Sequence, residues 1–393
     1  MQYRRFGRTE LSMPLFSCGG MRYQQSWQNI SLSEVNPDGQ LNLQSTILQA
    51  LSLGITHIET ARGYGSSELQ LGQILPHLPR EKLIVQTKVV PSADAQAFRK
   101  TFDQSLSLLK LNSVDLFGIH GINTPEILDW CLRPGGCLEV ARQLQREGKI
   151  RFVGFSTHGP TSVIIDAINT GEFDYVNLHW YYIFQNNWAA IEAANRQDMG
   201  VFIISPSDKG GHLYNPSDKL KNLCAPLSPI VFNDLFCLSH PQVHTLSIGA
   251  SRPTDFEEHR KTLPLLSDAQ THLNPILDRL EKASIAALGQ DWHNTWSIGL
   301  PTPAETPGNL NIPVMLWLYN LVKAYDLIEF AQARYNLLGN GDHWFPGKKA
   351  HNLHQLDLRS CLQNSPHADK IPAILQETHQ LLESGEVKRL SQV

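Results

Sequence analysis

The sequence predicts a (β/α)₈ barrel, a TIM barrel, followed by a small all-helical C-terminal extension. Eight short β-rich runs alternate with longer helical patterns over roughly residues 14–260. Several runs are almost continuously apolar, which is typical of parallel strands covered on both faces. Eight βα units in about 250 residues match the length of such a barrel. A doubly wound open sheet is the alternative, but FSCGGMRYQ lacks the GxGxxG spacing that usually follows its first strand.

The eight predicted strands share apolar and β-branched residues and end where glycine or polar residues follow. They are LFSCGG from Leu15, HIETA from His57, LIVQTKV from Leu83, VDLFGIHG from Val114, IRFVGFSTH from Ile150, YVNLHW from Tyr175, VFIISPS from Val201 and HTLSIGAS from His244. The segments between them predict helices. One of these has an apolar stripe at spacings of +4, +4 and +3, formed by Phe98, Phe102, Leu106 and Leu109. Another, CLEVARQLQREGK, is expected to stop at Gly148.

Beyond Pro264 the pattern changes to helices separated by the proline- and glycine-rich loop IGLPTPAETPGNLNIP. We therefore predict two domains, a barrel over residues 1–263 and a helical domain over residues 264–393. Helices are expected in DAQTHLNPILDRLEKASIAALG and IPAILQETHQLLESGE, and one helix or two short ones in VMLWLYNLVKAYDLIEFAQARYNLLG. These segments are too apolar for a disordered tail, so we expect them to pack on the barrel.

Composition excludes several classes of protein. Of the 393 residues, 41% are hydrophobic and 18% are charged, and the net charge of −4 provides no basic surface for nucleic acid or anionic membranes. The N-terminus lacks the apolar run of a secretory signal, and the longest apolar stretch, IPVMLWLYNLV, is too short to span a bilayer. Six scattered cysteines without a CxxC motif predict free thiols in a reducing, cytoplasmic compartment.

Four ionisable residues fall at the ends of three consecutive predicted strands. Glu59 and Tyr64 follow the second strand, Lys88 ends the third, and His120 ends the fourth. Each residue alone is more often a packing or surface residue than a catalytic one. Because active sites of such barrels lie at the C-terminal ends of the strands, the four together predict one catalytic site.

The motifs that carry these residues resemble the aldo-keto reductase superfamily over roughly residues 1–260. The similar stretches are GITHIETARGYGSSELQLGQIL, LIVQTKV, VDLFGIHG and GKIRFVGFSTH, in the family's order and spacing. The resemblance implies a barrel that binds NAD(P)H in an extended pose without a Rossmann fold. It implies that Tyr64 is the general acid, that Lys88 lowers the pKa of Tyr64, and that His120 orients the substrate carbonyl.

Glu59 is implied to hold Lys88 in place, but the family normally has aspartate at this position. An extra methylene changes the reach of the carboxylate, and a misplacement of about 1 Å can cost on the order of a hundredfold in rate. We therefore expect glutamate at position 59 to affect turnover more than cofactor binding. The alternative function is an NADP(H)-binding sensor or scaffold with little turnover.

The resemblance also implies cofactor contacts. Ser156 and Thr157 match the pair that holds the nicotinamide carboxamide, and Asn177 stands where the family often has glutamine for the same amide. His158 follows the pair and is a candidate for the pocket wall. Ser205 begins the loop expected to contact the pyrophosphate, and the residues expected to close over it are Lys209, Gly210 and Gly211.

The stretch GASRPTDFEEH resembles the loop that binds the adenosine phosphate, so Gly249, Ser251 and Arg252 are predicted cofactor residues. A helix N-terminus suits an anion there. The forked guanidinium of Arg252 would favour NADPH over NADH, whereas the alternative is a solvated surface charge. His259 replaces the family's usual asparagine. An aromatic group after the sixth strand is either a wall for the nicotinamide or ordinary packing: Trp180, Tyr181, Tyr182 and Trp188.

The C-terminal segment resembles, in layout, the ferredoxin-like helical domain of one branch of the superfamily. One [4Fe–4S] cluster normally needs four cysteine thiolates, and only Cys361 lies beyond residue 260. We therefore expect a degenerate domain without a cluster, which serves as a lid or a surface for a protein partner. No metal site is predicted, because the histidines are dispersed: His293, His343, His351, His354 and His367. The predicted function is NADPH-dependent reduction of a small aldehyde or ketone, with neither nucleic acid nor membrane as a partner.

Overall fold

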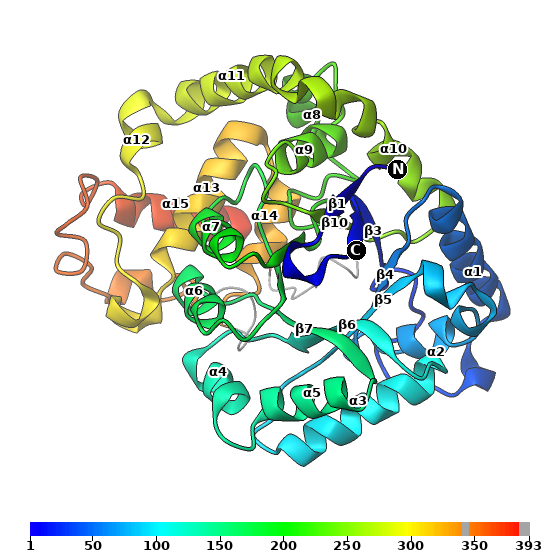
Figure 1. The fold of residues 1–393 in the computed structure, drawn as a ribbon. Helices are drawn as coiled ribbons and strands as arrows, with labels where there is room; N and C mark the ends of the chain where they lie inside the picture. The colour runs from blue at the N-terminus through cyan, green and yellow to red at the C-terminus, as the bar shows by residue number, and fades with distance from the viewer. Residues whose placement is uncertain (340–345, 385–393) are drawn as a thin grey trace. The chain divides into compact units, whose positions relative to one another are not determined.

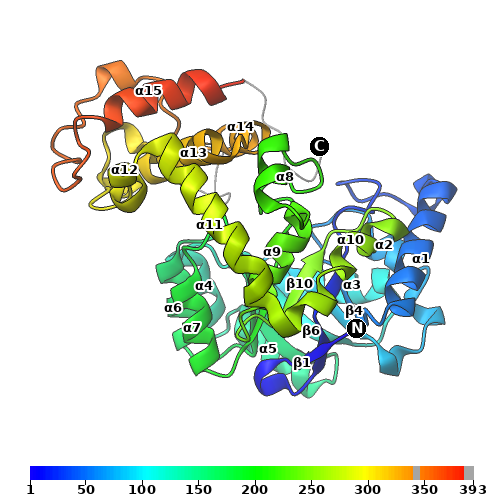
Figure 2. The same ribbon diagram turned by 90° about the horizontal axis from the view of Figure 1, so that it is seen from above.

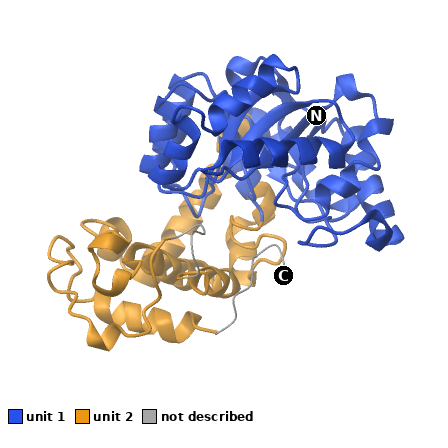
Figure 3. Ribbon diagram, turned by 90° about the horizontal axis from the view of Figure 1, so that it is seen from below, with its two compact units in different colours: residues 1–207, 233–267 blue, residues 208–232, 268–393 orange. Residues whose placement is uncertain are grey.

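A computed structural model describes residues 1–339 and 346–384 of the chain. These residues form two compact units, coloured separately in Figure 3. The barrel unit comprises residues 1–207 and 233–267, and the helical unit comprises residues 208–232 together with the described residues from 268 onward. The sequence-based boundary at 263/264 lies close to this division but did not anticipate that residues 208–232 group with the C-terminal helices.

The barrel unit contains a closed parallel barrel with the strand order β10-β3-β4-β5-β6-β7-β8-β9. Its strands are β3 (Phe16–Gly19), β4 (His57–Glu59), β5 (Ile84–Val89), β6 (Val114–His120), β7 (Ile150–Ser156), β8 (Tyr175–Leu178), β9 (Gly200–Ile203) and β10 (Thr245–Ile248). All eight predicted strands are confirmed. Closure of the sheet between β10 and β3 rules out the open-sheet alternative.

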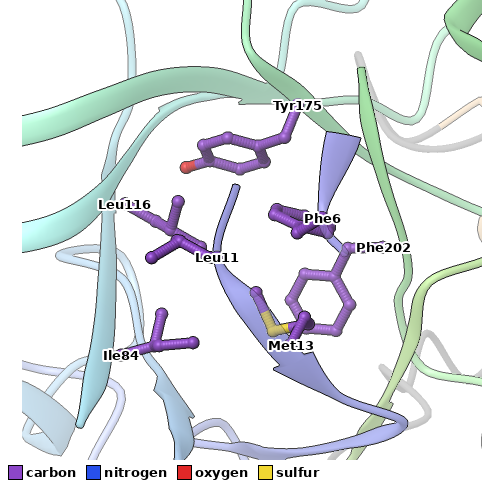
Figure 4. Close-up of a cluster of buried hydrophobic side chains, with 7 residues drawn as sticks. All are labelled: Phe6, Leu11, Met13, Ile84, Leu116, Tyr175 and Phe202. Atoms are coloured by element: carbon purple, nitrogen blue, oxygen red, sulfur yellow. The ribbon is translucent and has the colours of Figure 1, made fainter. Parts of the chain in front are cut away.

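A hairpin of two short strands precedes the barrel: β1 (Tyr3–Arg5) and β2 (Ser12–Pro14) pair antiparallel. The hairpin delivers apolar side chains into a cluster with the first residues of several barrel strands (Figure 4). The cluster consists of Phe6, Leu11, Met13, Ile84, Leu116, Tyr175 and Phe202. Because Ile84 and Tyr175 begin their strands, this packing fills the N-terminal end of the barrel and leaves the other end for a site.

Helices surround the strands of the barrel unit (Figures 1 and 2). They are α1 (Pro37–Ser52), α2 (Ser67–Leu71), α3 (Ala95–Leu109), α4 (Pro125–Leu132), α5 (Cys137–Arg146), α6 (Thr161–Asn169), α7 (Trp188–Arg196), α9 (Pro229–Leu238) and α10 (Phe256–Arg260). The predicted apolar stripe of α3 is buried, and Phe102 packs edge-on against Phe117 of β6 at 4.8 Å between ring centroids. The α5 helix ends just before Gly148, whose φ of +70° suits its role as a stop.

The helical unit is built around one apolar helix. Its helices are α8 (Asp218–Cys224), α11 (Ala269–Leu288), α12 (Gln290–Thr295), α13 (Ile312–Tyr325), α14 (Ile328–Tyr335) and α15 (Ile371–Leu382). The α13 helix contacts α11, α14 and α15. The segment predicted as one helix or two forms two, because Asp326 adopts a left-handed conformation (φ +58°) between α13 and α14. The resemblance to a ferredoxin-like domain stays a prediction.

No helix among residues 1–339 and 346–384 has the length and apolar character required to cross a membrane. All six cysteines lie in this part of the chain, and none of them forms a disulfide.

Candidate active site

A buried ion pair lies at the C-terminal ends of β4 and β5. The Nζ atom of Lys88 donates to the Glu59 carboxylate and, at 2.8 Å, to the carbonyl oxygen of Thr60. Both charged side chains are at least 95% buried. Gly118 stands opposite Lys88 in the β5–β6 register, and a Cβ atom there would lie 2.8 Å from Lys88 Cγ. The missing side chain therefore makes room for the lysine stem, and the longer glutamate still reaches the ammonium.

Tyr64 and His120 lie beside this pair. The tyrosine sits in the loop after β4, and its ring meets the His120 ring edge-on, with 5.8 Å between centroids. The Lys88 ammonium is 5.0 Å from the centroid of the Tyr64 ring. The structure thus brings the predicted catalytic residues of three neighbouring strands to one place at the mouth of the barrel.

The pKa of Tyr64 is raised, whereas the sequence predicts a pKa that Lys88 lowers. Burial raises the pKa of Tyr64 well above its ordinary value, and the negative charge of Glu59 raises it further. The physical reason is that the Lys88 ammonium is already neutralised by Glu59, whose carboxylate lies close enough to oppose a phenolate. At neutral pH the phenol therefore keeps its proton but is a weaker acid than a free tyrosine.

Ser156 and Asn177 lie side by side along the same edge. The register pairs His120 with Ser156 across β6–β7, and Ser156 with Asn177 across β7–β8. Asn177 is fully buried, and among the residues that the structure describes neither polar atom of its side chain has a hydrogen-bond partner. A buried amide left in this state is costly, and a ligand with a complementary amide would satisfy its donor and acceptor. The nicotinamide carboxamide fits this requirement.

Thr157 is engaged within its own loop. Its hydroxyl donates to the Ile122 carbonyl at 2.8 Å and accepts from the Gly159 backbone at 3.0 Å. Its only O–H is therefore engaged, and only the second lone pair of the oxygen is left to accept from a carboxamide. Ser156 Oγ, by contrast, accepts a single bond at 3.2 Å, from the Gly121 backbone, in the described part of the chain.

A hydrogen-bonded chain that sequence reasoning missed begins at His158. Its Nδ1 lies 2.5 Å from Nε2 of His179, whose Nδ1 lies 2.5 Å from the hydroxyl of Tyr181. Tyr181 donates to the carbonyl of Ile204, so its oxygen accepts from His179, and His179 accepts from His158. A sequence signal exists, because the histidines stand two residues after Ser156 and Asn177, on matching faces of neighbouring strands.

The aromatic residues after β8 mostly pack against α7 and α9. Trp180 is 2% exposed and stacks on Phe236 at 4.9 Å between ring centroids. It also contacts Trp188 at 5.1 Å, and Tyr182 meets Phe236 edge-on at 5.7 Å. These contacts favour the packing interpretation over a wall for the nicotinamide.

The predicted pyrophosphate residues fall in different units. Ser205 belongs to the barrel unit and adopts a left-handed conformation (φ +53°), which is uncommon outside glycine and typical of functional loops. Lys209 belongs to the helical unit, where burial lowers its pKa well below the ordinary value and the charge of Arg334 lowers it further, against the opposing effect of Asp208. The roles of both residues, and of Gly210 and Gly211, stay predictions.

The loop after β10 satisfies its own polar groups. Asp255 accepts from the backbone and hydroxyl of Ser251 at 2.8 and 3.0 Å, and from Arg252 Nε at 3.0 Å. The expected anion site at a helix N-terminus is therefore already occupied by a carboxylate, and α10 has only five residues. His259 is buried and bonds Asp234 of α9 at 2.5 Å, so it is part of the core.

The histidines of the helical unit are less dispersed than predicted. His351, His379 and Glu383 form one group whose potential ligand atoms lie within 4.8 Å of one another. Lys349 Nζ is 2.9 Å from the Glu383 carboxylate and already supplies a positive charge there. His293 and His367 instead bond Ser284 and Thr295, each at 2.8 Å, and His343 lies outside the described residues.

Comparison with known proteins adds independent information. The model of the Aldo/keto reductase family matches residues 16–220. The chain is 30% identical over 167 residues to NADH-specific methylglyoxal reductase of Escherichia coli, covering 36% of this chain and 50% of that protein. It is 29% identical over 187 residues to L-galactose dehydrogenase of Arabidopsis thaliana, covering 44% of this chain and 57% of that protein. The matches thus span only about half the length of these relatives.

A solved structure shows the same fold. The holo form of the aldo-keto reductase AKR11C1 from Bacillus halodurans aligns with a TM-score of 0.58 and 20% identity, over 70% of this chain and 96% of that chain. At this identity the likeness concerns the fold alone.

Proposed function

This chain belongs to the aldo/keto reductase family, and we propose that it reduces an aldehyde or ketone by hydride transfer from NADH or NADPH, with Tyr64 as general acid. The observation that carries the proposal is the meeting of Tyr64, Lys88 and His120 at the barrel mouth, with the buried amide of Asn177 two strands farther along the same edge. Tyr64, Lys88 and His120 can donate a proton to a reacting oxygen and stabilise its charge. The amide of Asn177 can hold a nicotinamide. A carbonyl substrate and a nicotinamide dinucleotide together account for these four residues.

In this mechanism the dinucleotide supplies the hydride, and the protein supplies the proton and the electrostatics. Tyr64 transfers its phenolic proton to the carbonyl oxygen as the carbon is reduced to an alcohol. Glu59 fixes the position of Lys88, and the ammonium of Lys88 in turn partly offsets the charge of Glu59 beside the phenolate that remains. His120 donates a hydrogen bond to the same oxygen and orients it. A proton from water then restores Tyr64.

Cofactor binding is assigned to residues on the neighbouring strands. Asn177 and Ser156 would hold the carboxamide, and Ser205 would meet the pyrophosphate. The sequence predicted NADPH because of Arg252. In the structure, however, Arg252 is paired with Asp255.

The substrate is proposed to be a small carbonyl compound. Two similar proteins are named for methylglyoxal and for L-galactose, which are both small and oxygen-rich. A cytoplasmic location and a protein partner for the helical unit belong to the same proposal. The unpaired thiols are compatible with a reducing compartment.

The experiment that tests the proposal is the substitution Tyr64→Phe. Turnover of small aldehydes should fall by about 10² to 10⁴-fold, because the proton donor is lost. The affinity for the dinucleotide should change less than about twofold, since the hydroxyl has no predicted contact with it. The matched control is Tyr3→Phe, which removes a hydroxyl bonded to the distant Gly54 carbonyl. Equal turnover in Tyr64→Phe and wild type would exclude the role.

A second candidate function is a dinucleotide sensor or scaffold with little turnover. It is favoured by the raised pKa of Tyr64 and by glutamate at position 59. The substitution Glu59→Asp separates the two functions. A large gain in reductase rate would indicate a detuned sensor, whereas a loss would indicate an enzyme adapted to glutamate.

A further inference from the structure

The loop between β10 and α10 contains a carboxylate at the place where the sequence predicts a phosphate. Asp255 accepts three hydrogen bonds, from the Ser251 backbone, the Ser251 hydroxyl and Arg252 Nε, at 2.8 to 3.0 Å. Ser251 and Arg252 are both predicted cofactor residues, and Arg252 is the one expected to contact the 2′-phosphate of NADPH. Within the described structure, Asp255 therefore takes up both donors of Ser251 and the Nε–H of Arg252.

Asp255 is held in its charged form. Its side chain is only 10% exposed, and burial alone would raise its pKa. The bonds from Ser251 and Arg252 outweigh burial and leave the pKa below its ordinary value. At neutral pH the loop thus presents a fixed negative charge, and Glu257 and Glu258 follow directly in α10.

A fixed carboxylate discriminates between the two dinucleotides. The 2′-phosphate carries nearly two negative charges at neutral pH, and any contact with Ser251 or Arg252 would bring it close to the negative charge of Asp255. The 2′-hydroxyl of NADH is a neutral donor, which a carboxylate can accept, as acidic residues do in other NAD sites. The Arg252 side chain, 72% exposed, can stay paired with Asp255 in that case.

We propose that Asp255 is a specificity-determining residue that makes this chain select NADH over NADPH. The inference rests on the proposed function, because it requires the loop after β10 to receive the adenosine ribose. It also reverses the preference expected from Arg252 alone. Arg252 then serves to hold Asp255 rather than to bind a phosphate.

The test is a fluorescence titration of the whole protein with NADH and with NADPH in the absence of substrate. Wild type should bind NADH at least about tenfold more tightly than NADPH. The substitution Asp255→Asn keeps the shape of the side chain but removes its charge, so the ratio of the two dissociation constants should fall at least about tenfold, mainly through tighter NADPH binding. The matched control is Asp278→Asn, which removes an exposed carboxylate paired with Lys282 in α11 and should leave the ratio unchanged.

The outcomes of these titrations separate this inference from the proposed function. A wild-type preference for NADPH, or an unchanged ratio in Asp255→Asn, would overturn the role of Asp255 while leaving the reductase proposal intact. Failure of wild type to bind either dinucleotide would overturn both. Competition by 2′,5′-ADP that is stronger in Asp255→Asn than in wild type would support the inference without involving the nicotinamide end.

Discussion

Two carboxylate–cation pairs at the strand ends of the barrel differ in their surroundings. Glu59 and Lys88 are both nearly inaccessible to solvent, whereas in the second pair Asp255 is largely covered and only Arg252 is mostly exposed. The buried pair interacts in a low dielectric and cannot lose one member without stranding a charge. In the pair with the exposed arginine, called the exposed pair below, water screens the guanidinium, so the ion pair contributes little to stability. The comparison indicates that burial determines the role of a carboxylate–cation pair. A buried pair stabilises the fold and positions catalytic groups, whereas a pair with an exposed member only selects a ligand.

The largest effect is expected when the buried pair is broken. Lys88→Met keeps the length of the side chain but leaves Glu59 buried without its partner, so the free energy of unfolding should fall by about 3–5 kcal/mol. Urea unfolding measures this change. The double variant Glu59→Gln with Lys88→Met should be more stable than Lys88→Met alone. A single variant as stable as wild type would contradict the difference drawn between the two pairs.

Acid should act on the buried side of the barrel more than on the exposed loop. Burial lowers the pKa of His57 to about 3, and the charge of Lys88 lowers it further. The unfolded chain takes up this proton near pH 6.5, whereas the folded protein does not. The associated stability is therefore complete above pH 6.5 and is lost as the pH falls toward 3, by on the order of 4 kcal/mol.

Urea unfolding at several pH values tests the contribution of His57. His57→Gln should flatten the dependence of stability on pH in this window, although His244, with a pKa of about 4, contributes in the same direction. The exposed His77→Gln variant is the control and should retain the wild-type slope. An equal slope in wild type and His57→Gln would show that the His57 proton does not govern acid stability.

A smaller effect is expected when Asn177 is replaced, because the substitution should weaken NADH binding without destabilising the fold. Asn177→Leu replaces an amide that lacks partners in the described structure, so stability should stay constant or rise slightly, while NADH affinity should fall about tenfold. Thermal unfolding and fluorescence titration give the two quantities. Asn187→Leu is the matched comparison, because that amide donates to the His179 carbonyl at 2.9 Å and its loss should destabilise the fold.

The smallest effect concerns the exposed pair itself. Asp255→Asn should change the free energy of unfolding by less than about 1 kcal/mol, since Arg252 is solvated with or without its partner. Urea unfolding beside the Lys88→Met series provides the measurement. A loss as large as that of Lys88→Met would mean that the exposed loop is a structural element and would remove the contrast between the two pairs.

Much of this molecule could be predicted from its sequence. The eight barrel strands are near-continuous apolar runs, and the rule that barrel sites form at strand ends brought Glu59, Lys88 and His120 together in advance. The N-terminal hairpin was missed because strands of three residues carry no measurable periodicity. The α3 helix was recognised because its 15 residues are enough to show a helical apolar periodicity.

The interactions inside the site were harder to foresee. The partner of Arg252 could not be predicted, since Asp255 lies three residues away in a turn whose geometry the sequence does not specify. The pKa of Tyr64 depends on its burial and on the neutralisation of Lys88, which are properties of packing. The contact of His158 with His179 requires the register of β7 and β8.

The most direct measurement is a single-turnover reaction with dinucleotide deuterated at the reactive carbon of the nicotinamide and a panel of small aldehydes. Wild type should transfer one deuterium to the carbinol carbon of the alcohol, as read by mass spectrometry. Tyr64→Phe, at equal cofactor occupancy, should do so at least about a hundredfold more slowly. Wild type that binds the dinucleotide tightly yet labels no alcohol would contradict hydride transfer and leave the barrel as a sensor.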